Sequence, residues 1–298
     1  MFLLLIITYQ ILNNSTEVMN SVKFSFDIWK NNIFPSILPF FIISSLLINY
    51  GFVELAAYIF KPLMFLFGIN PNVSIAFVMS ILSGFPSSSK YIKELLDKKL
   101  INEQEASKAL MFTHFSNPLF ILGTISSLLN KKIAIFILII HYSTNIIIGI
   151  LFRNYHNTYT KSKMNFKSPD SKDIGSILII SIKTSIEILL LILGSISVCS
   201  FICTIINHTF NFNNIVSTLI NGLFEITQGL KYVSLLNIPI KLKTTISVMF
   251  LSFGGLSIHI QVKSILDIHI KYIPYFISRI IHTVISGILS FILFDIFI

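Results

Sequence analysis

Long apolar segments, several of them interrupted by glycine or proline, follow one another along almost the whole chain. Hydrophobic residues make up 54% of the 298 residues, and charged residues only 12%. A soluble domain does not need so much apolar side chain, and the segments are long enough for several membrane-spanning helices. The alternation of apolar and polar residues that a transmembrane β-barrel needs is absent from them. We therefore predict an all-α, polytopic integral membrane protein, embedded in a lipid bilayer.

The formal net charge of +9 is distributed as in a membrane protein and not as in a nucleic-acid-binding protein. Lysine and arginine lie between the apolar segments, as the positive-inside rule requires. They are densest between residues 153 and 172, which predicts a cytoplasmic loop there. Cys199 and Cys203 are four apart in an apolar segment, a spacing that does not suit a normal disulfide within a helix. We expect no nucleic-acid partner and no cofactor.

Two apolar stretches share a pattern that suggests an internal repeat. Residues 111–120 and 249–258 both begin Met-Phe, have Phe three positions later, and then contain a helix-breaking pair. Gly-Ile-Leu at 149–151 recurs at 287–289, with the same offset of 138 residues. The pattern predicts two related halves, each with a discontinuous helix.

Each half contains a second, earlier interruption. Residues 83–91 and 225–232 are polar, contain glycine and end in Lys-Tyr. In the first half, Asn70-Pro71 is typical of a helix start, and the apolar run ends near residue 82. A helix of this length spans about 20 Å, whereas the hydrocarbon core is about 30 Å thick. We therefore expect a re-entrant element here.

The interruptions are candidate binding elements, because lipid offers no hydrogen bonds to a broken helix. A half-helix that starts inside the membrane presents free N–H groups to an anionic or polar group. Glu225 lies in an apolar segment, where a charge is costly unless it is paired, and Lys90, Lys231 and Arg279 are its candidate partners. Matched broken helices in two halves point to a binding site between them. The predicted substrate-binding residues are Ser83, Gly84, Pro86, Lys90, Ser116, Asn117, Pro118, Glu225, Thr227, Ser252, Gly254, Gly255, Ser257 and Gln261.

Other motifs support no catalytic or metal-binding residue. Residues 87–90 match Ser-x-x-Lys, but the companion motifs of penicillin-binding enzymes are absent. His114, His141, His259 and His282 lack the short-range spacing of metal ligands, so we expect them to form hydrogen bonds between helices. The structural alternative for every interruption is a kink that binds nothing, since Gly and Pro are common in membrane helices.

Several motifs together resemble the YlbJ family of sporulation integral membrane proteins. The order and spacing match over roughly residues 25 to 295, and Ser-Asn-Pro-Leu-Phe at 116–120 is the most specific part. The other motifs are Phe-Pro-Ser-x-x-Pro-Phe at 34–40, Ser-Gly-Phe-Pro at 83–86, Lys90, and His141-Tyr142 with Asn145.

The resemblance implies nucleoside-recognition "gate" domains, which spore maturation membrane proteins and concentrative nucleoside transporters also resemble. Residues 252–258 resemble the second re-entrant tip of such transporters. Asn117-Pro118 stands where those transporters carry Gln-Thr-Glu, which weakens the case for a nucleoside substrate. The family likeness further implies a role in endospore formation, around cortex assembly, in a membrane of the sporulating cell.

The predicted organisation has four parts. They are an N-terminal apolar segment and polar loop at 1–24, a first gate-like repeat at 25–153, a basic linker at 154–173 and a second gate-like repeat at 174–298. The leading hypothesis is a protein that binds or transports a small polar solute at a midplane site between the broken helices. One alternative is a non-transporting scaffold for other sporulation envelope proteins. The other is an intramembrane enzyme, which requires converging catalytic side chains. A structure with dispersed histidines would exclude this hypothesis. The partners that we expect are a second copy of the chain, in a homo-oligomer, or other sporulation membrane proteins.

Overall fold

The computed structural model describes residues 2–156, 173–266 and 268–298, without the side chains of residues 2–4 and 6. Every regular element in these ranges is a helix. Five of the described helices are long and apolar enough to cross a membrane, or six if one sharply bent pair counts as a span. The prediction of an all-α, multi-pass membrane protein is confirmed. The predicted basic linker lies almost entirely outside the described residues.

The first half begins with a long interrupted helix. Residues Ser15–Asn49 form one candidate span of 35 residues, which contains a π-helical turn at Trp29–Ile33. The polar residues before position 25, predicted as a loop, are therefore helical. α2 packs closely against α12 through small side chains, and the Ser25 hydroxyl donates a hydrogen bond to Ser200 Oγ at 3.0 Å. The elements here are α1 (Phe2–Asn13), α2 (Ser15–Ile28), η1 (Trp29–Ile33), α3 (Phe34–Asn49), α4 (Phe52–Ile59) and α5 (Lys61–Phe67).

A helical hairpin follows, with its tip inside the molecule. After a bend of 110° the chain forms η2 (Pro71–Val73) and α6 (Ser74–Ser83), and then returns as α7 (Ser87–Asp97). The Asn72 side chain donates to the Leu100 carbonyl at 2.9 Å, and this hydrogen bond joins the two helical arms of the hairpin at its base. The re-entrant element expected from the short apolar run is thus a hairpin whose tip is residues 84–86.

The first broken helix comes next. α8 (Glu103–Phe112) starts with a capping box between Asn102 and Glu105, and Thr113 is its C-cap. After four non-helical residues, Asn117 caps a second half-helix, because its Oδ1 accepts from the N–H groups of Leu119 at 2.7 Å and Phe120 at 3.3 Å. This half-helix consists of α9 (Pro118–Phe120), the π-helical η3 (Ile121–Ile125) and α10 (Ser126–Leu128), and the straight α11 (Lys131–Leu151) follows.

The second half has the same order of long helix, hairpin, broken helix and straight helix, without counterparts of α4 and α5. The 37-residue α12 (Ile174–Phe210), about 55 Å long, precedes a hairpin of α13 (Asn214–Phe224) and α14 (Ile226–Leu235). A helix broken at Gly254, consisting of α15 (Ile240–Phe253) and α16 (Gly255–Ile265), and the straight α17 (Ile273–Phe297) complete it.

The prediction of a second re-entrant tip at residues 252–258 is wrong. The chain folds back at Glu225 instead, between α13 and α14. The helices α13 and α14 fold back on each other because Gly222 and Gly229 let them touch: a Cβ on Gly229 would lie 2.3 Å from Gly222 Cα. At this break two consecutive glycines have positive φ, +95° at Gly254 and +60° at Gly255, and α15 and α16 together still form one candidate span. The later interruption is therefore a local break in a crossing helix.

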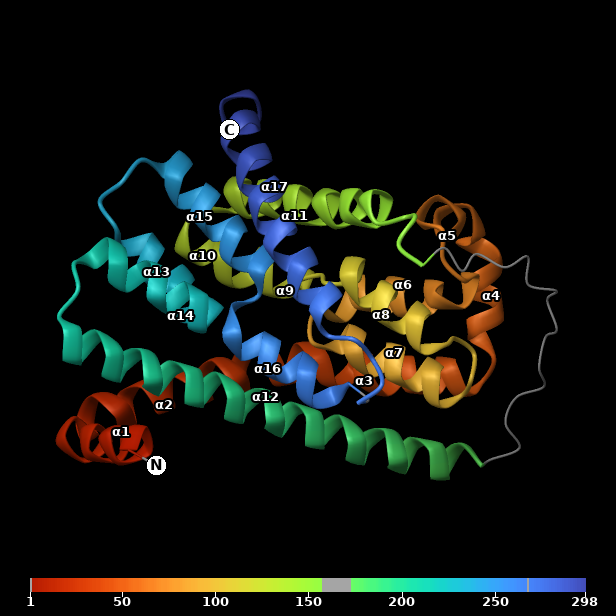
Figure 1. Ribbon diagram of the computed structural model, residues 1–298, viewed down its shortest axis with the longest axis horizontal. Coiled ribbons are helices and arrows are strands. Elements are labelled where there is room, and N and C mark those ends of the chain that lie inside the picture. Colours follow the sequence, from red (N-terminus) through yellow and green to blue (C-terminus); the bar gives the residue numbers. More distant parts are fainter. Residues whose placement is uncertain (1, 157–172, 267) are drawn as a thin grey trace.

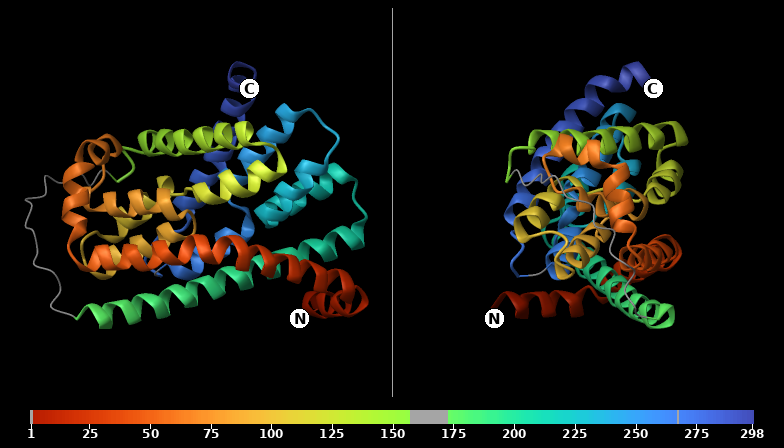
Figure 2. Two further views of the ribbon diagram at one scale, coloured as in Figure 1. Left: turned by 180° about the vertical axis from the view of Figure 1, so that it is seen from behind. Right: turned by 90° about the vertical axis from the view of Figure 1, so that its right-hand side faces the viewer.

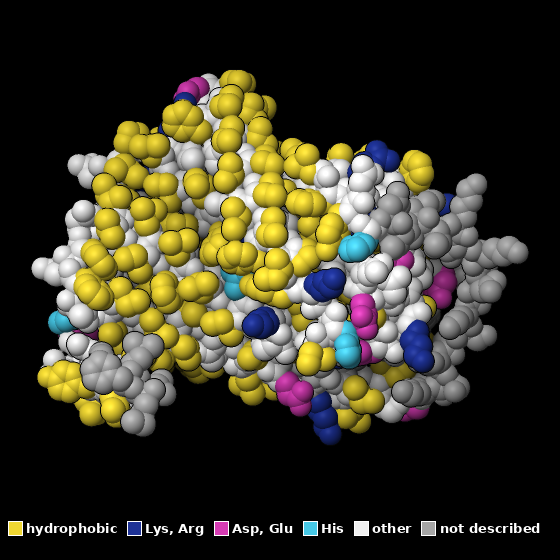
Figure 3. Space-filling view, viewed as in Figure 1, with side chains coloured by type: hydrophobic (Ala, Val, Ile, Leu, Met, Phe, Trp, Pro, Cys, Tyr) yellow, Lys and Arg dark blue, Asp and Glu magenta, His cyan; other side chains and the backbone are white. Residues whose placement is uncertain are grey.

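The hairpins and broken helices lie in the middle of the molecule, between the long helices. Figure 1 shows α12 running along one side next to α2 and α3, and α11 along the opposite side. The view from behind shows the same arrangement, with the hairpin α13–α14 between them (Figure 2). Hydrophobic side chains cover most of the face formed by α13, α15 and α17, and charged side chains gather in the right half of the view (Figure 3). Such a surface suits lipid on the apolar face.

Lys108 illustrates how the ends of helices are joined in the first half. Its fully buried ammonium donates to the carbonyls of Gly68 at 2.8 Å and Arg153 at 2.7 Å, at the C-terminal ends of α5 and α11. A cation is favourable at a helix C-terminus. We expect Lys108→Ala to lower the free energy of unfolding by about 2–3 kcal/mol, because two buried carbonyls lose their donor.

Thermal unfolding of the purified protein in detergent would measure this loss. Lys93→Ala is the matched control, because Lys93 forms only an exposed pair with Asp97, which contributes little. Burial, followed by the charge of Arg153, lowers the pKa of Lys108 from 10.5 to about 8. Between these values the unfolded chain binds more protons, so the Lys108-dependent part of stability rises with pH from about 8 to 10.5. A loss in Lys108→Ala no larger than in Lys93→Ala would contradict this role.

Candidate functional site

The two broken helices meet at His141, a fully buried residue of α11. Its Nε2 accepts a hydrogen bond from the backbone N–H of Ser116 at 3.0 Å, which leaves the proton on Nδ1. Nδ1 lies 3.2 Å from Ser252 Oγ and donates to it. One neutral imidazole therefore joins the break after α8 to the break before α16.

A buried arginine supports this junction from α17. Arg279 donates from Nη1 to His282 Nδ1 at 2.8 Å and from Nη2 to the carbonyl of Met111, in the last turn of α8. His282 Nε2 in turn donates to the His141 carbonyl at 3.2 Å. The positive charge lies where the C-terminal end of α8 favours it. Arg279 thus holds α8, α11 and α17 together.

The tip of the first hairpin is fastened to the first break. The Asn117 Nδ2 donates to the Ser83 carbonyl at 3.2 Å, and the Phe85 N–H donates to the Phe115 carbonyl at 2.6 Å. There is no room between them for a side chain on Gly84, because a Cβ there would lie 2.4 Å from the Asn117 nitrogen. The Asn117 side chain therefore binds the hairpin tip through Nδ2 and caps α9 through Oδ1.

Glu225 forms the tip of the second hairpin and caps α14. It is 3% exposed, and its Oε2 accepts from the N–H of Gln228 at 2.9 Å and from the Thr227 hydroxyl. The expected ion pair with Lys90, Lys231 or Arg279 is absent from the described part of the chain. Lys90 is next to Glu94 at 3.4 Å, and Lys231 lies over the ring of Phe24. Both lysines contact other groups, although Lys231 belongs to α14 itself, so the Glu225 carboxylate faces the interior without a positive charge.

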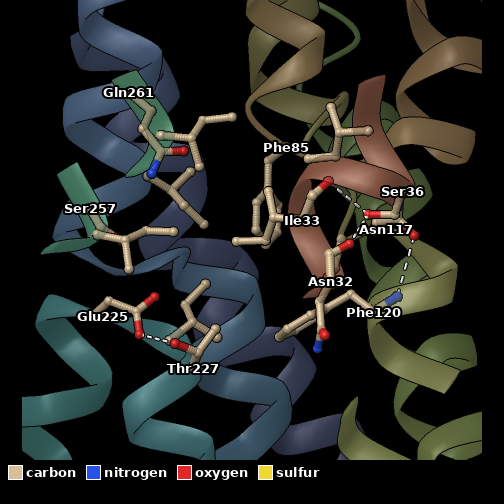
Figure 4. Close-up of a pocket in the computed structure, with 16 residues that line it drawn as sticks. Asn32, Ile33, Ser36, Phe85, Asn117, Phe120, Glu225, Thr227, Ser257 and Gln261 are labelled. Atoms are coloured by element: carbon tan, nitrogen blue, oxygen red, sulfur yellow. Dashed lines mark hydrogen bonds between the residues drawn. The ribbon is translucent and has the colours of Figure 1, made fainter. Parts of the chain in front are cut away.

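A cavity of about 60 Å³ lies between the two halves. Figure 4 shows Glu225, Ser257 and Gln261 on one side of it, Asn32, Ser36 and Asn117 on the other, and Phe85 between them. The predicted residues that line it are Ser116, Asn117, Glu225, Thr227, Ser257 and Gln261. The Ser116 and Ser257 hydroxyls and the Gln261 Nε2 are buried and have no hydrogen-bond partner within the described residues. The cavity thus collects polar groups that no protein group satisfies.

The other predicted residues lie outside the cavity and shape its surroundings. Ser83, Gly84 and Pro86 belong to the hairpin tip, where the Ser83 hydroxyl donates to the Met79 carbonyl and accepts from Tyr91. Lys90 lies deeper in the first half and donates to the Phe41 carbonyl at 2.9 Å. The remaining four form the backbone at the two breaks: Pro118, Ser252, Gly254 and Gly255.

Sequence reasoning missed several residues of the site. His141 was assigned only to hydrogen bonding between helices, although a polar residue in an apolar span signalled a special position. Asn32 and Ser36 line the cavity, but neither was predicted as part of the site. Phe85 and Phe120 also line it, and no pattern in so phenylalanine-rich a chain distinguishes them.

The histidines are not dispersed. The ring of His141 lies 4.9 Å from that of His282 and 6.4 Å from that of His114, measured between centroids. His259 is linked to Tyr272 at 2.5 Å and to the Phe253 carbonyl at 3.1 Å. The expected hydrogen bonds between helices are thus present, and the dispersal that would remove an intramembrane enzyme is not observed.

A second, wider hollow of about 530 Å³ adjoins the cavity, and we call it the vestibule. The vestibule and the cavity share Asn32, Ser36 and Phe120. The π-helical turns η1 and η3 lie on either side, and Asn32 Nδ2 donates across it to Thr124 Oγ1 at 3.1 Å. Phe120 therefore lies where the two hollows meet.

The comparisons with known proteins agree with the sequence motifs. The curated protein "Sporulation integral membrane protein YlbJ" of Bacillus subtilis (strain 168) is 28% identical over 327 residues, which cover 95% of this chain and 79% of the relative. The predicted resemblance to the YlbJ family is confirmed. A family model described as Gate, nucleoside recognition, matches residues 32–132. That range contains the first-half wall of the cavity, from Asn32 through Phe120. No solved structure matches the chain.

Proposed function

We propose that this protein binds a small polar solute in the cavity and moves it across a membrane of the sporulating cell, in support of cortex assembly. The observation that carries the proposal is the set of unsatisfied polar groups around Glu225. YlbJ is named as a sporulation integral membrane protein, and the cortex part of the proposal depends on the likeness to that family.

Unsatisfied polar groups at membrane depth need an explanation. Each buried hydroxyl or amide without a partner costs about 1–3 kcal/mol, and a carboxylate without a counter-charge costs more. Three such groups and Glu225 line one cavity. Apolar side chains would fill the same space at a lower free-energy cost, so packing alone does not explain these polar groups. A solute that supplies their missing hydrogen-bond partners does explain them.

The size of the cavity suits a closed state of a transporter. A volume of 60 Å³ holds a few water molecules, whereas pockets for larger organic ligands are commonly about 300–1,000 Å³. The vestibule supplies a route to the cavity, and movement of Phe120 would connect them. Broken helices at the interface of two repeats are the elements that transporters use at their binding sites.

Uptake by proteoliposomes tests the proposal. The vesicles would be offered labelled methylammonium, sodium, glycine, uridine and N-acetylglucosamine in turn, with the wild-type protein, Asn117→Ala and Glu225→Gln. We expect uptake of at least one probe above that of empty vesicles, and a loss of about tenfold or more in both variants. Asn49→Ala and Asp295→Asn are the controls, because they remove a partly exposed amide and an exposed pair with Lys241.

The scaffold hypothesis makes the opposite prediction. It expects Asn117→Ala and Glu225→Ala to leave sporulation intact, whereas substitutions in the loops abolish it. Counting heat-resistant spores in a strain that depends on this protein separates the two. Normal spore counts in both cavity variants, together with no uptake of any probe, would overturn the proposed function.

A further inference from the structure

His114 is a fully buried histidine with one unused ring nitrogen. It lies in the first break, just after α8, where its carbonyl accepts a hydrogen bond from Asn145 Nδ2. The side chain is 0% exposed, and Nε2 has no hydrogen-bond partner within residues 2–156, 173–266 and 268–298. A buried polar atom without a partner costs free energy, so this nitrogen needs an explanation.

Tyr275 determines what the unused nitrogen offers. The Tyr275 hydroxyl and His114 Nδ1 are 3.0 Å apart. The described residues offer this hydroxyl no other hydrogen-bond partner, so we assign it as the donor to Nδ1. The ring proton is then on Nε2, and His114 presents an unused N–H donor.

The unused N–H lies at the second break. A Cβ on Gly254 would lie 3.0 Å from His114 Nε2, so the ring lies directly against the glycine that precedes α16. The N-terminus of α16 has no side-chain cap, and Ser257 in its first turn has a fully buried hydroxyl without a partner among the described residues. Ser257 lines the cavity. One break therefore brings together unused donors from both halves of the chain.

Phe85 covers His114. The two rings are stacked, with 4.6 Å between their centroids and 22° between their planes. Phe85 is only partly buried and lines the cavity, whereas His114 is not part of the lining. The close-up shows Phe85 between the two polar sides of the cavity (Figure 4). Movement of Phe85 would therefore add the unused donor to the cavity wall.

We propose that His114 is a further ligand of the solute, and that it donates from Nε2 to an oxygen of the solute once Phe85 has moved. This inference rests on the proposed function and names a specificity-determining residue of the same site. It restricts the solute to molecules with an oxygen acceptor. In the closed cavity Phe85 occupies space that the solute needs, because 60 Å³ holds only a few water molecules.

Thermal unfolding in detergent at constant ionic strength tests the inference with small probes of similar size. Acetamide and acetate each offer an oxygen acceptor, whereas isopropylammonium offers only donors. We expect a saturable rise in the unfolding midpoint with acetamide, acetate or both, because ligands that bind only the folded state stabilise it. The probes are offered at millimolar concentrations, since such small ligands bind weakly. A response to acetamide alone identifies a carbonyl group, and a response to acetate alone identifies a carboxylate.

Three variants show whether the response depends on His114. His114→Phe keeps a ring that can stack on Phe85 but removes Nε2, so it should weaken the apparent affinity at least about tenfold. His114→Gln supplies an amide N–H and should restore part of the affinity. Tyr275→Phe is the matched control, because it removes the same hydrogen bond between Tyr275 and His114 but leaves Nε2 in place. It should keep the affinity of the wild type.

Phe85→Ala gives a second readout that needs no change at His114, even if the His114 variants do not fold. Without the covering ring, the apparent affinity for the same probe should rise about tenfold, because binding no longer requires Phe85 to move. No response to acetamide or acetate in either the wild type or Phe85→Ala would overturn the inference. So would an equal response to isopropylammonium, or an undiminished response in His114→Phe.

The results also separate this inference from the proposed function. Uptake that depends on Asn117 and Glu225 but is unchanged in His114→Phe would retain transport and reject His114 as a ligand. A probe response that depends on His114, in a protein that takes up no labelled solute, would retain the ligand and reject transport.

Discussion

Replacing Gly84 with alanine is expected to destabilise the protein by about 4 kcal/mol or more, enough to prevent normal accumulation in the membrane. Gly84 has φ +78° and ψ −175°, a conformation that residues with a Cβ rarely adopt. The added Cβ would also lie 2.4 Å from the backbone nitrogen of Asn117, and neither backbone can move without separating the hairpin tip from the first break. The same change should therefore lower stability and abolish uptake.

The measurement is the amount of folded protein in detergent and its unfolding midpoint. Gly194→Ala is the matched control, because a Cβ there meets no atom within 4 Å and the residue lies inside α12. We expect this control to be neutral or slightly stabilising, as alanine favours a helix interior. A Gly84→Ala protein as stable as the Gly194→Ala protein would show that the close approach to Asn117 is wrong.

Replacing Phe120 with alanine should open the cavity to the vestibule. The probe is a cysteine in place of Ser116, in a chain where Cys199 and Cys203 are replaced by serine. Because Phe120 is shared by the cavity and the vestibule, its removal should raise the rate of modification by a water-soluble methanethiosulfonate reagent about tenfold or more.

Phe85→Ala is the control for this experiment. Phe85 also lines the cavity, but it stacks on His114 and has no part in the vestibule. Its removal enlarges the closed space without connecting it to the outside, so the modification rate should stay close to that of the parent. Equal acceleration by both substitutions would mean that Phe120 does not separate the two hollows.

The sequence predicted the backbone of the site better than its side chains. Signals that act over a few residues were sufficient: Asn70 and Asn117 form the helix start and the break that their local patterns indicate. The breaks at 113–117 and at Gly254 also occur where a helix-breaking pair interrupts an apolar run.

Contacts between distant segments could not be read in the same way. Glu225 was identified by its charge in an apolar segment, but its lack of a cationic partner depends on where Lys90 and Arg279 are held. His141 joins the two breaks because α11 passes between them, which no local pattern encodes. The second re-entrant tip was placed at residues 252–258 from the family resemblance, whereas the fold-back at Glu225 depends on the contact between Gly222 and Gly229.

Both halves of the chain line one shared cavity. The direct measurement is mass spectrometry of a chain with Ser116→Cys and Ser257→Cys, with Phe120 intact and Cys199 and Cys203 replaced by serine, after prolonged treatment with a methanethiosulfonate reagent in membranes. Each single cysteine should be modified, and the double variant should carry one adduct per molecule, because a space of about 60 Å³ does not hold two. Two adducts on the double variant, or none on either single variant, would contradict the account.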